Sequence, residues 1–175
     1  MQFKGGISGI VCCGLLGWVT SAIATNPGIE LSSDERLITL LQTNDIHGSV
    51  EPKVDRQGFR IGGMAFWIGA IDAIRTGLRR QFGEHAGVLL VDAGDQFQGT
   101  LISNYNEGQL VFSLMNLAGY QAVLPGNHDY DFGPIGWLDD QVVPGHPDQN
   151  PRGALERLVA MARFPLLSAN VYEKT

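Results

Sequence analysis

Three short polar clusters contain the residues of this chain that are best suited to bind a metal ion. They occupy residues 43–48 (TNDIHG), 92–95 (DAGD) and 125–131 (PGNHDYD). Their carboxylates, imidazoles and amide oxygen form a mixed oxygen and nitrogen set, which suits zinc, manganese, iron or cobalt better than calcium. Two such ions, about 3.5–4 Å apart, can clamp a phosphoryl group for in-line displacement. The clusters therefore predict metal-dependent hydrolysis.

The spacing of residues within the clusters favours chelation. Asp45 and His47 are two residues apart, so in extended backbone both side chains would project to the same side and could bind one ion. Asp95 could bridge two ions, and Asn127 offers a neutral amide oxygen. Taken alone, each cluster is more typical of a turn or a capping pair. Their occurrence after three successive strands favours a site over solvated loops.

Apolar runs and helical spacing place each cluster at the end of a predicted strand. Short apolar runs predict buried strands at residues 37–42, 87–91, 120–124 and 164–169. Apolar residues at helical spacing predict helices at residues 64–80, 108–118 and 154–163. Strands that alternate with helices imply an α/β fold whose sheet is at least partly parallel. In such folds, polar sites form in the loops beyond the carboxyl ends of the strands.

The N-terminal segment has the pattern of a secretory signal peptide. Residues 7–24 are apolar or small, and an A-x-A site at residues 22–24 precedes a breaker, so we expect residues 1–24 to be removed. An uncleaved membrane anchor is the alternative, although glycines interrupt the apolar stretch. Residues 25–36 form a polar lead-in. We therefore expect an exported protein, periplasmic or extracellular, with no stable membrane span after cleavage.

Composition narrows the classes of function further. The formal net charge is −6 and no basic cluster is present, which argues against binding of a nucleic acid duplex. Both cysteines, Cys12 and Cys13, lie inside the signal segment. The mature chain would therefore have no disulfide, no thiolate metal site and no cysteine nucleophile. The 175 residues suffice for one α/β core and are few for two domains.

The order of the motifs resembles that of a known family. D-x-H, then G-D, then G-N-H-[DE] is similar to the signature of the calcineurin-like metallophosphoesterases. TNDIHG, GGMA, DAGDQFQGT and LPGNHDYDFG resemble more narrowly the 5′-nucleotidase branch, which includes periplasmic UDP-sugar hydrolases. The resemblance implies a four-layer αββα sandwich. Residues 37–175 would be the N-terminal portion of its catalytic domain, incomplete and without the C-terminal nucleotide-binding domain.

The resemblance also implies a role for individual residues. It makes metal ligands of four residues: Asp45, His47, Asp95 and Asn127. Asp45 and His47 would bind the first of two divalent ions, Asp95 would bridge them, and Asn127 would bind the second. His128 would be the catalytic histidine, and Asp131 would fix its orientation. Asp92 matches no ligand position and is interpreted as a polar residue at a strand end. His85 precedes the second predicted strand, at the wrong end for the site, and His146 is a loop residue that resembles no later motif of the family.

These features predict an enzyme of nucleotide catabolism that acts on a small-molecule substrate. We expect the full-length protein to hydrolyse a phosphate ester, foremost a nucleoside 5′-monophosphate. Alternative activities within this class are 2′,3′-cyclic nucleotide phosphodiesterase, UDP-sugar hydrolase and thiosulfohydrolase, because Gly-Asn-His-Asp is shared among them. A rival of another class is a truncated, catalytically inactive fragment, since further metal ligands of the family come from later in its catalytic domain. A membrane-anchored adhesion module is a weaker third hypothesis.

Overall fold

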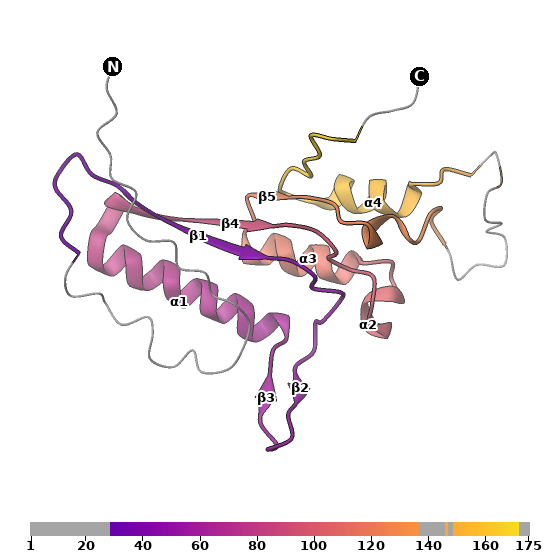
Figure 1. The fold of residues 1–175 in the computed structure, drawn as a ribbon, viewed down its shortest axis with the longest axis horizontal. Helices are drawn as coiled ribbons and strands as arrows, with labels where there is room; N and C mark the ends of the chain where they lie inside the picture. Colours follow the sequence, from indigo (N-terminus) through magenta and orange to yellow (C-terminus); the bar gives the residue numbers. More distant parts are fainter. Residues whose placement is uncertain (1–28, 137–145, 147–148, 172–175) are drawn as a thin grey trace.

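A three-stranded parallel sheet lies at the centre of the computed structural model, which describes residues 29–136, 146 and 149–171 (Figure 1). The strand order is β1 (Leu37–Thr43), β4 (Ala86–Asp92), β5 (Ala122–Val123). β1 and β4 pair in register from Leu37 opposite Ala86 to Thr43 opposite Asp92. The two strands therefore end side by side, and the polar clusters that follow them begin at the same edge of the sheet.

Helices connect the strands and form the core with them. α1 (Met64–Phe82) and the short turn η1 (Gly83–His85) join β1 to β4, while α2 (Leu101–Asn104) and α3 (Gln109–Ala118) join β4 to β5. α4 (Gly153–Met161) follows in the C-terminal part. α3 ends at Gly119, which has a left-handed backbone and donates its N–H to the Met115 carbonyl. The predicted α/β class with a parallel sheet is confirmed, and the predicted helix bounds are close to those observed.

Two predictions about the strands need correction. The expected fourth strand at residues 164–169 is reduced to a single parallel bridge between Val123 and Leu166. The ladder cannot lengthen there because β5 itself has only two residues and runs directly into Leu124 and Pro125. A small hairpin also lies between the first predicted strand and the first predicted helix, where no strand was predicted. Its antiparallel strands are β2 (Lys53–Val54) and β3 (Arg60–Ile61).

The two faces of the parallel sheet differ in what covers them. Alternate residues such as Leu41 and Leu90 are buried in the core with side chains of α1, α3 and α4. Their neighbours point to the other face, where Ile38, Leu40 and Leu89 are 70%, 51% and 41% exposed. Figure 1 shows α1 and α3 on the same side of the strands. In the described part of the chain, one face of the sheet is thus packed and the other leaves aliphatic side chains in contact with solvent.

The predicted signal peptide, residues 1–24, lies outside the described residues, as does the start of the lead-in at residues 25–28. Removal of the signal peptide therefore stays a prediction. Across the residues that the structure does describe, no helix combines the length and apolar character needed to cross a membrane.

Candidate metal centre

The loops after β1 and β4 are joined by backbone hydrogen bonds that continue the strand pairing. The Asp45 N–H donates to the Gly94 carbonyl at 2.9 Å, and the His47 N–H donates to the Asp95 carbonyl at 3.0 Å. The first two polar clusters are therefore held against each other by main chain. This pairing brings Asp45, His47 and Asp95 together, although α1, η1 and three strands (β2, β3 and β4) separate the two loops along the chain.

The backbone of these three residues is unusual. Asp45, His47 and Asp95 have φ angles of 53°, 46° and 60°, which places them in the left-handed region. In the described residues, Glu107 is the one further non-glycine residue with positive φ. The expectation of extended backbone at Asp45 and His47 was therefore wrong. Left-handed backbone costs an L residue of this kind about 1–3 kcal/mol and is often found at functional sites, where the surrounding structure enforces it.

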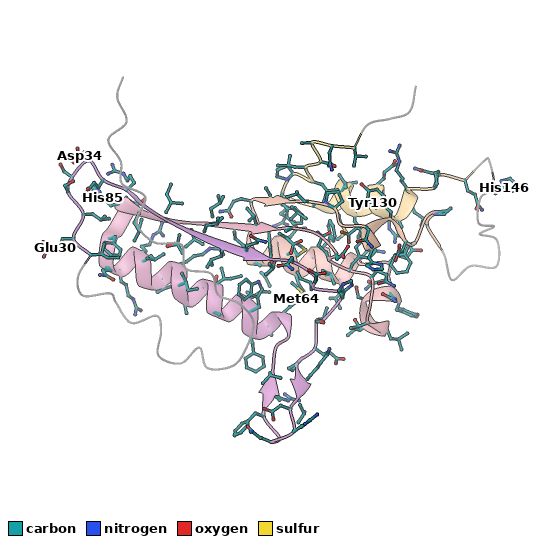
Figure 2. The ribbon with its side chains drawn as sticks, in the orientation of Figure 1. Glu30, Asp34, Met64, His85, Tyr130 and His146 are labelled. Atoms are coloured by element: carbon teal, nitrogen blue, oxygen red, sulfur yellow. The ribbon has the colours of Figure 1, made fainter. Side chains whose placement is uncertain are left out.

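The three side chains converge beyond the ends of β1 and β4, where Figure 2 shows a dense group of polar side chains. One ligand atom from each of Asp45, His47 and Asp95 can be chosen so that all lie within 4.8 Å of one another. His47 Nε2 lies 3.7 Å from Asp45 Oδ1 and 3.9 Å from Asp95 Oδ2. Ligand atoms in a tetrahedral zinc site lie about 3.3–3.5 Å apart, so the two separations from His47 Nε2 need only a small contraction.

The hydrogen bonding of His47 fits a metal ligand. Its Nδ1 lies 2.9 Å from the Gln98 carbonyl oxygen, which can only accept a hydrogen bond. Nδ1 must therefore carry the proton, and in the neutral ring Nε2 has a free lone pair directed at the two carboxylates. A backbone carbonyl that orients a histidine in this way is common behind metal ligands. The donor set and its orientation thus fit a divalent cation.

The third polar cluster is locked to the second through two carboxylates. Asp95 Oδ1 accepts the His128 N–H at 3.0 Å. In the other direction, the buried Asp129 carboxylate accepts the N–H groups of Asp95, Gln96 and Gly126, at 2.9, 3.0 and 2.7 Å. Burial raises the pKa of Asp129 to about 6, against the opposing effect of these three donors. No sequence pattern pointed to this function of Asp129, because its partners are mostly backbone groups of a distant loop.

The approach of these loops requires glycine. A Cβ at Gly126 would lie 2.1 Å from Asp95 Oδ1, and a Cβ at Gly94 would lie 2.7 Å from the Gly126 backbone nitrogen. Gly94 also has a φ of 117°, which L side chains rarely adopt. Gly94 and Gly126, which lie inside the second and third clusters, therefore allow the Asp95 side chain to lie against the third loop.

His128 and Asp131 form a pair at the edge of this site. His128 is the first residue of the 3₁₀ turn η2 (His128–Tyr130), and Asp131 directly follows this turn. Side chains three residues apart in a 3₁₀ turn lie one above the other. His128 Nδ1 lies 2.6 Å from Asp131 Oδ2, and this hydrogen bond raises the pKa of the His128 imidazole. The His128 ring centroid is 5.3 Å from that of His47. Asn127 immediately precedes His128 and is exposed.

The other two histidines lie elsewhere. His85 contacts Arg36 and the Glu35 carbonyl, near the amino end of β1. His146 is exposed. Figure 2 shows them at opposite ends of the view, on either side of Tyr130. Asp92, by contrast, is close to the site but fully buried, and its oxygens accept hydrogen bonds from Thr43, Gln96 and Gly94.

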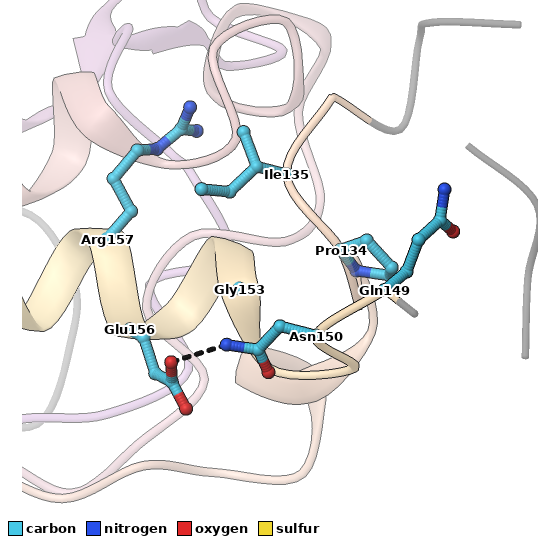
Figure 3. Close-up of a pocket in the computed structure, with 7 residues that line it drawn as sticks. All are labelled: Pro134, Ile135, Gln149, Asn150, Gly153, Glu156 and Arg157. Carbon is cyan, nitrogen blue, oxygen red and sulfur yellow. Dashed lines mark hydrogen bonds between the residues drawn. The ribbon is translucent and has the colours of Figure 1, made fainter. Parts of the chain in front are cut away.

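An open pocket of about 390 Å³ lies beside α4 and is separate from this centre. Figure 3 shows its lining, in which Asn150 donates a hydrogen bond to Glu156. Arg157, also in the lining, forms an ion pair with the buried Glu107. None of the candidate ligands lines the pocket. These polar groups bind one another, so we interpret the pocket as part of the framework that holds α4.

Comparison with known proteins decides the family. Residues 38–170, most of the chain, match the family model of the calcineurin-like phosphoesterases. This chain belongs to the calcineurin-like phosphoesterase family. The family assignment agrees with the order of the three polar clusters, and several relatives of this phosphoesterase chain are named 5′-nucleotidase.

Two relatives and one solved structure illustrate the similarity. This phosphoesterase chain is 36% identical to a snake venom 5′-nucleotidase of Gloydius brevicauda over 137 residues, which are 78% of this chain and 20% of the venom protein. It is 32% identical to the protein UshA of Salmonella pullorum over 155 residues, 88% and 24% of the two chains. The crystal structure of a 5′-nucleotidase precursor from Thermus thermophilus superposes with a TM-score of 0.54 at 30% identity, over 75% and 22% of the two chains. The chain thus spans between a fifth and a quarter of the length of these relatives.

Proposed function

We propose that this chain supplies part of the metal centre of an exported phosphoesterase that removes phosphate from nucleoside 5′-monophosphates. The convergence of Asp45, His47 and Asp95 supports the metal centre most directly, because one ligand atom of each lies within 4.8 Å of the others. The relatives named 5′-nucleotidase support the choice of substrate. The signal-peptide pattern of residues 1–24 supports export.

We propose a separate role for each of the four candidate metal ligands. Asp45 and His47 would hold the first of two divalent ions, Asp95 would bridge both, and Asn127 would contribute its amide oxygen to the second. Such ions lower the pKa of water and offset the charge of phosphoryl oxygens. The Gln98 carbonyl keeps the His47 proton on Nδ1, so Nε2 remains the ligand atom.

His128 would act on the substrate. Its Nδ1 is held by Asp131, so Nε2 is the nitrogen left to stabilise a phosphoryl oxygen or to give a proton to the leaving oxygen. The same hydrogen bond raises the pKa of the His128 imidazole, and a larger fraction of the rings is therefore protonated near neutral pH. Asp131 contributes by fixing the orientation and the tautomer of the ring.

A second candidate is a chain that binds one ion without turnover. Asp45, His47 and Asp95 form a single group in the described residues, and the chain spans only 20% of the venom relative. Phosphate release from AMP, with 2′,3′-cyclic AMP and UDP-glucose as competing substrates, separates the two candidates. We expect turnover that falls in a His128→Ala variant and not in a His85→Ala control, whose ring lies at the other end of the molecule. Metal binding without turnover would indicate the second candidate, and equal turnover in both variants would contradict the proposed role of His128.

A further inference from the structure

A buried chain of hydrogen bonds ends at Asp92, which is 0% exposed and is not among the candidate ligands. Thr43 Oγ1 donates to Asp92 Oδ2 at 2.6 Å and lies 2.8 Å from the Tyr120 hydroxyl. The Trp67 indole N–H of α1 donates to the same hydroxyl at 3.1 Å. We call Asp92, Thr43, Tyr120 and Trp67 the Asp92 relay. It joins both strand ends at the site to α1 and to the start of β5.

The relay has one consistent direction. Thr43 has a single hydroxyl proton, and it is donated to the Asp92 carboxylate. The Thr43 oxygen therefore accepts the Tyr120 proton, and the Tyr120 oxygen accepts from the Trp67 indole, which can only donate. Asp92 Oδ1 accepts two more bonds, from Gln96 Nε2 at 2.7 Å and from the Gly94 N–H at 2.9 Å. Every hydroxyl proton in the relay thus has a defined partner.

The Asp92 relay contacts the loops after β1 and β4 close to the candidate metal ligands Asp45 and Asp95. Thr43 is two residues before Asp45, and Gly94 immediately precedes Asp95. A single carboxylate therefore binds the last residue of β1 and the loop of β4 at once. Because these anchors are so close in the chain to Asp45 and Asp95, a shift of either anchor would alter the distance between the two carboxylates.

We propose that the Asp92 relay positions Asp45 and Asp95 relative to each other and thereby sets the metal affinity of the site, with Thr43 as its central residue. This inference rests on the proposed function, since it needs a metal at these ligands. The relay residues are positioning residues and bind neither metal nor substrate. Positioning groups behind metal ligands typically change the affinity about 10–100-fold when they are removed.

Thr43 offers a matched pair of variants. Thr43→Val keeps the shape of the side chain and removes the hydroxyl, whereas Thr43→Ser keeps the hydroxyl and removes a methyl group. We expect Thr43→Val to weaken Mn²⁺ binding about 10–100-fold and Thr43→Ser to restore it to within about threefold of wild type. Calorimetric titration of the purified full chain with Mn²⁺ measures this, with Asp72→Asn as a control for removal of an exposed carboxylate.

The outcomes separate the inference from the proposed function. Wild-type chain that binds no Mn²⁺, or binds it equally well after Asp95→Ala, would overturn the metal centre and the inference with it. Binding that is lost in Asp95→Ala but unchanged in Thr43→Val would overturn the inference alone. Should Thr43→Val fail to fold by circular dichroism, Tyr120→Phe tests the next bond of the relay. We expect it to weaken Mn²⁺ binding by about threefold or more, and unchanged binding there would equally refute the relay.

Discussion

Asp129 should be a main source of rigidity in the site, and replacing it tests how the loops are held. Its carboxylate accepts three backbone N–H groups, from Asp95, Gln96 and Gly126, and its side chain is 1% exposed. Asp129→Ala leaves all three donors without that partner. A buried donor without a partner costs about 1–3 kcal/mol, although water that enters the vacated space satisfies part of this requirement.

The removal of a buried charge offsets part of the loss as well. We therefore expect Asp129→Ala to lower the free energy of unfolding by about 2–4 kcal/mol. In a chain of this size that corresponds to a fall in Tm of roughly 5–15 °C. Thermal unfolding followed by circular dichroism in the presence of EDTA measures the effect on the protein fold without a contribution from bound metal.

Asp131→Ala is the matched control in the same loop. The Asp131 carboxylate is 43% exposed and pairs with His128, whose side chain is 41% exposed. Exposed pairs contribute about 0–1 kcal/mol, so the Tm of this variant should fall by no more than about 3 °C. Equal Tm shifts in the two variants would refute the view that Asp129 is what holds the second and third loops together.

Three further predictions concern the reaction, the sheet and export. In the full-length protein, His128→Ala should retain its metal content while turnover falls about 10²–10⁴-fold, and Asp131→Asn should cause a smaller fall; metal analysis beside kcat checks this, and metal lost in proportion to activity would make His128 a ligand. Ile38→Thr combined with Leu40→Thr should reduce self-association of the chain in analytical ultracentrifugation, because both side chains are exposed on the unpacked sheet face; unchanged sedimentation would show that this face is not adhesive. N-terminal sequencing of exported protein should begin at Thr25, and a start at Met1 would contradict removal of the signal peptide.

The sequence was sufficient to predict how the first two clusters come together. The apolar runs before Thr43 and Asp92 identified two buried strands, and their alternation with helices implied a sheet that is at least partly parallel. Parallel neighbours end at the same edge of a sheet, so Asp45 and Asp95 had to lie close together. The helix at Gln109–Ala118 was equally predictable from the sequence, because apolar spacing and Gly119 mark its extent.

Other features depend on contacts that no local pattern encodes. The left-handed backbone of Asp45 and His47 is enforced by hydrogen bonds to the loop after β4. Asp129 has the sequence context of an ordinary turn residue, and only the folded chain shows its carboxylate bound to the Asp95 and Gln96 N–H groups. The β2–β3 hairpin has two residues in each strand, too few for an alternating pattern to appear in the sequence.

We propose that Asp45, His47 and Asp95 together bind one divalent cation. Anomalous diffraction at the manganese or zinc edge, from crystals grown with that ion, locates it without reference to activity. We predict a peak within bonding distance of His47 Nε2 and of a carboxylate oxygen from each of Asp45 and Asp95. A peak at His85 or His146 with none between these three residues would show that they do not form the metal site.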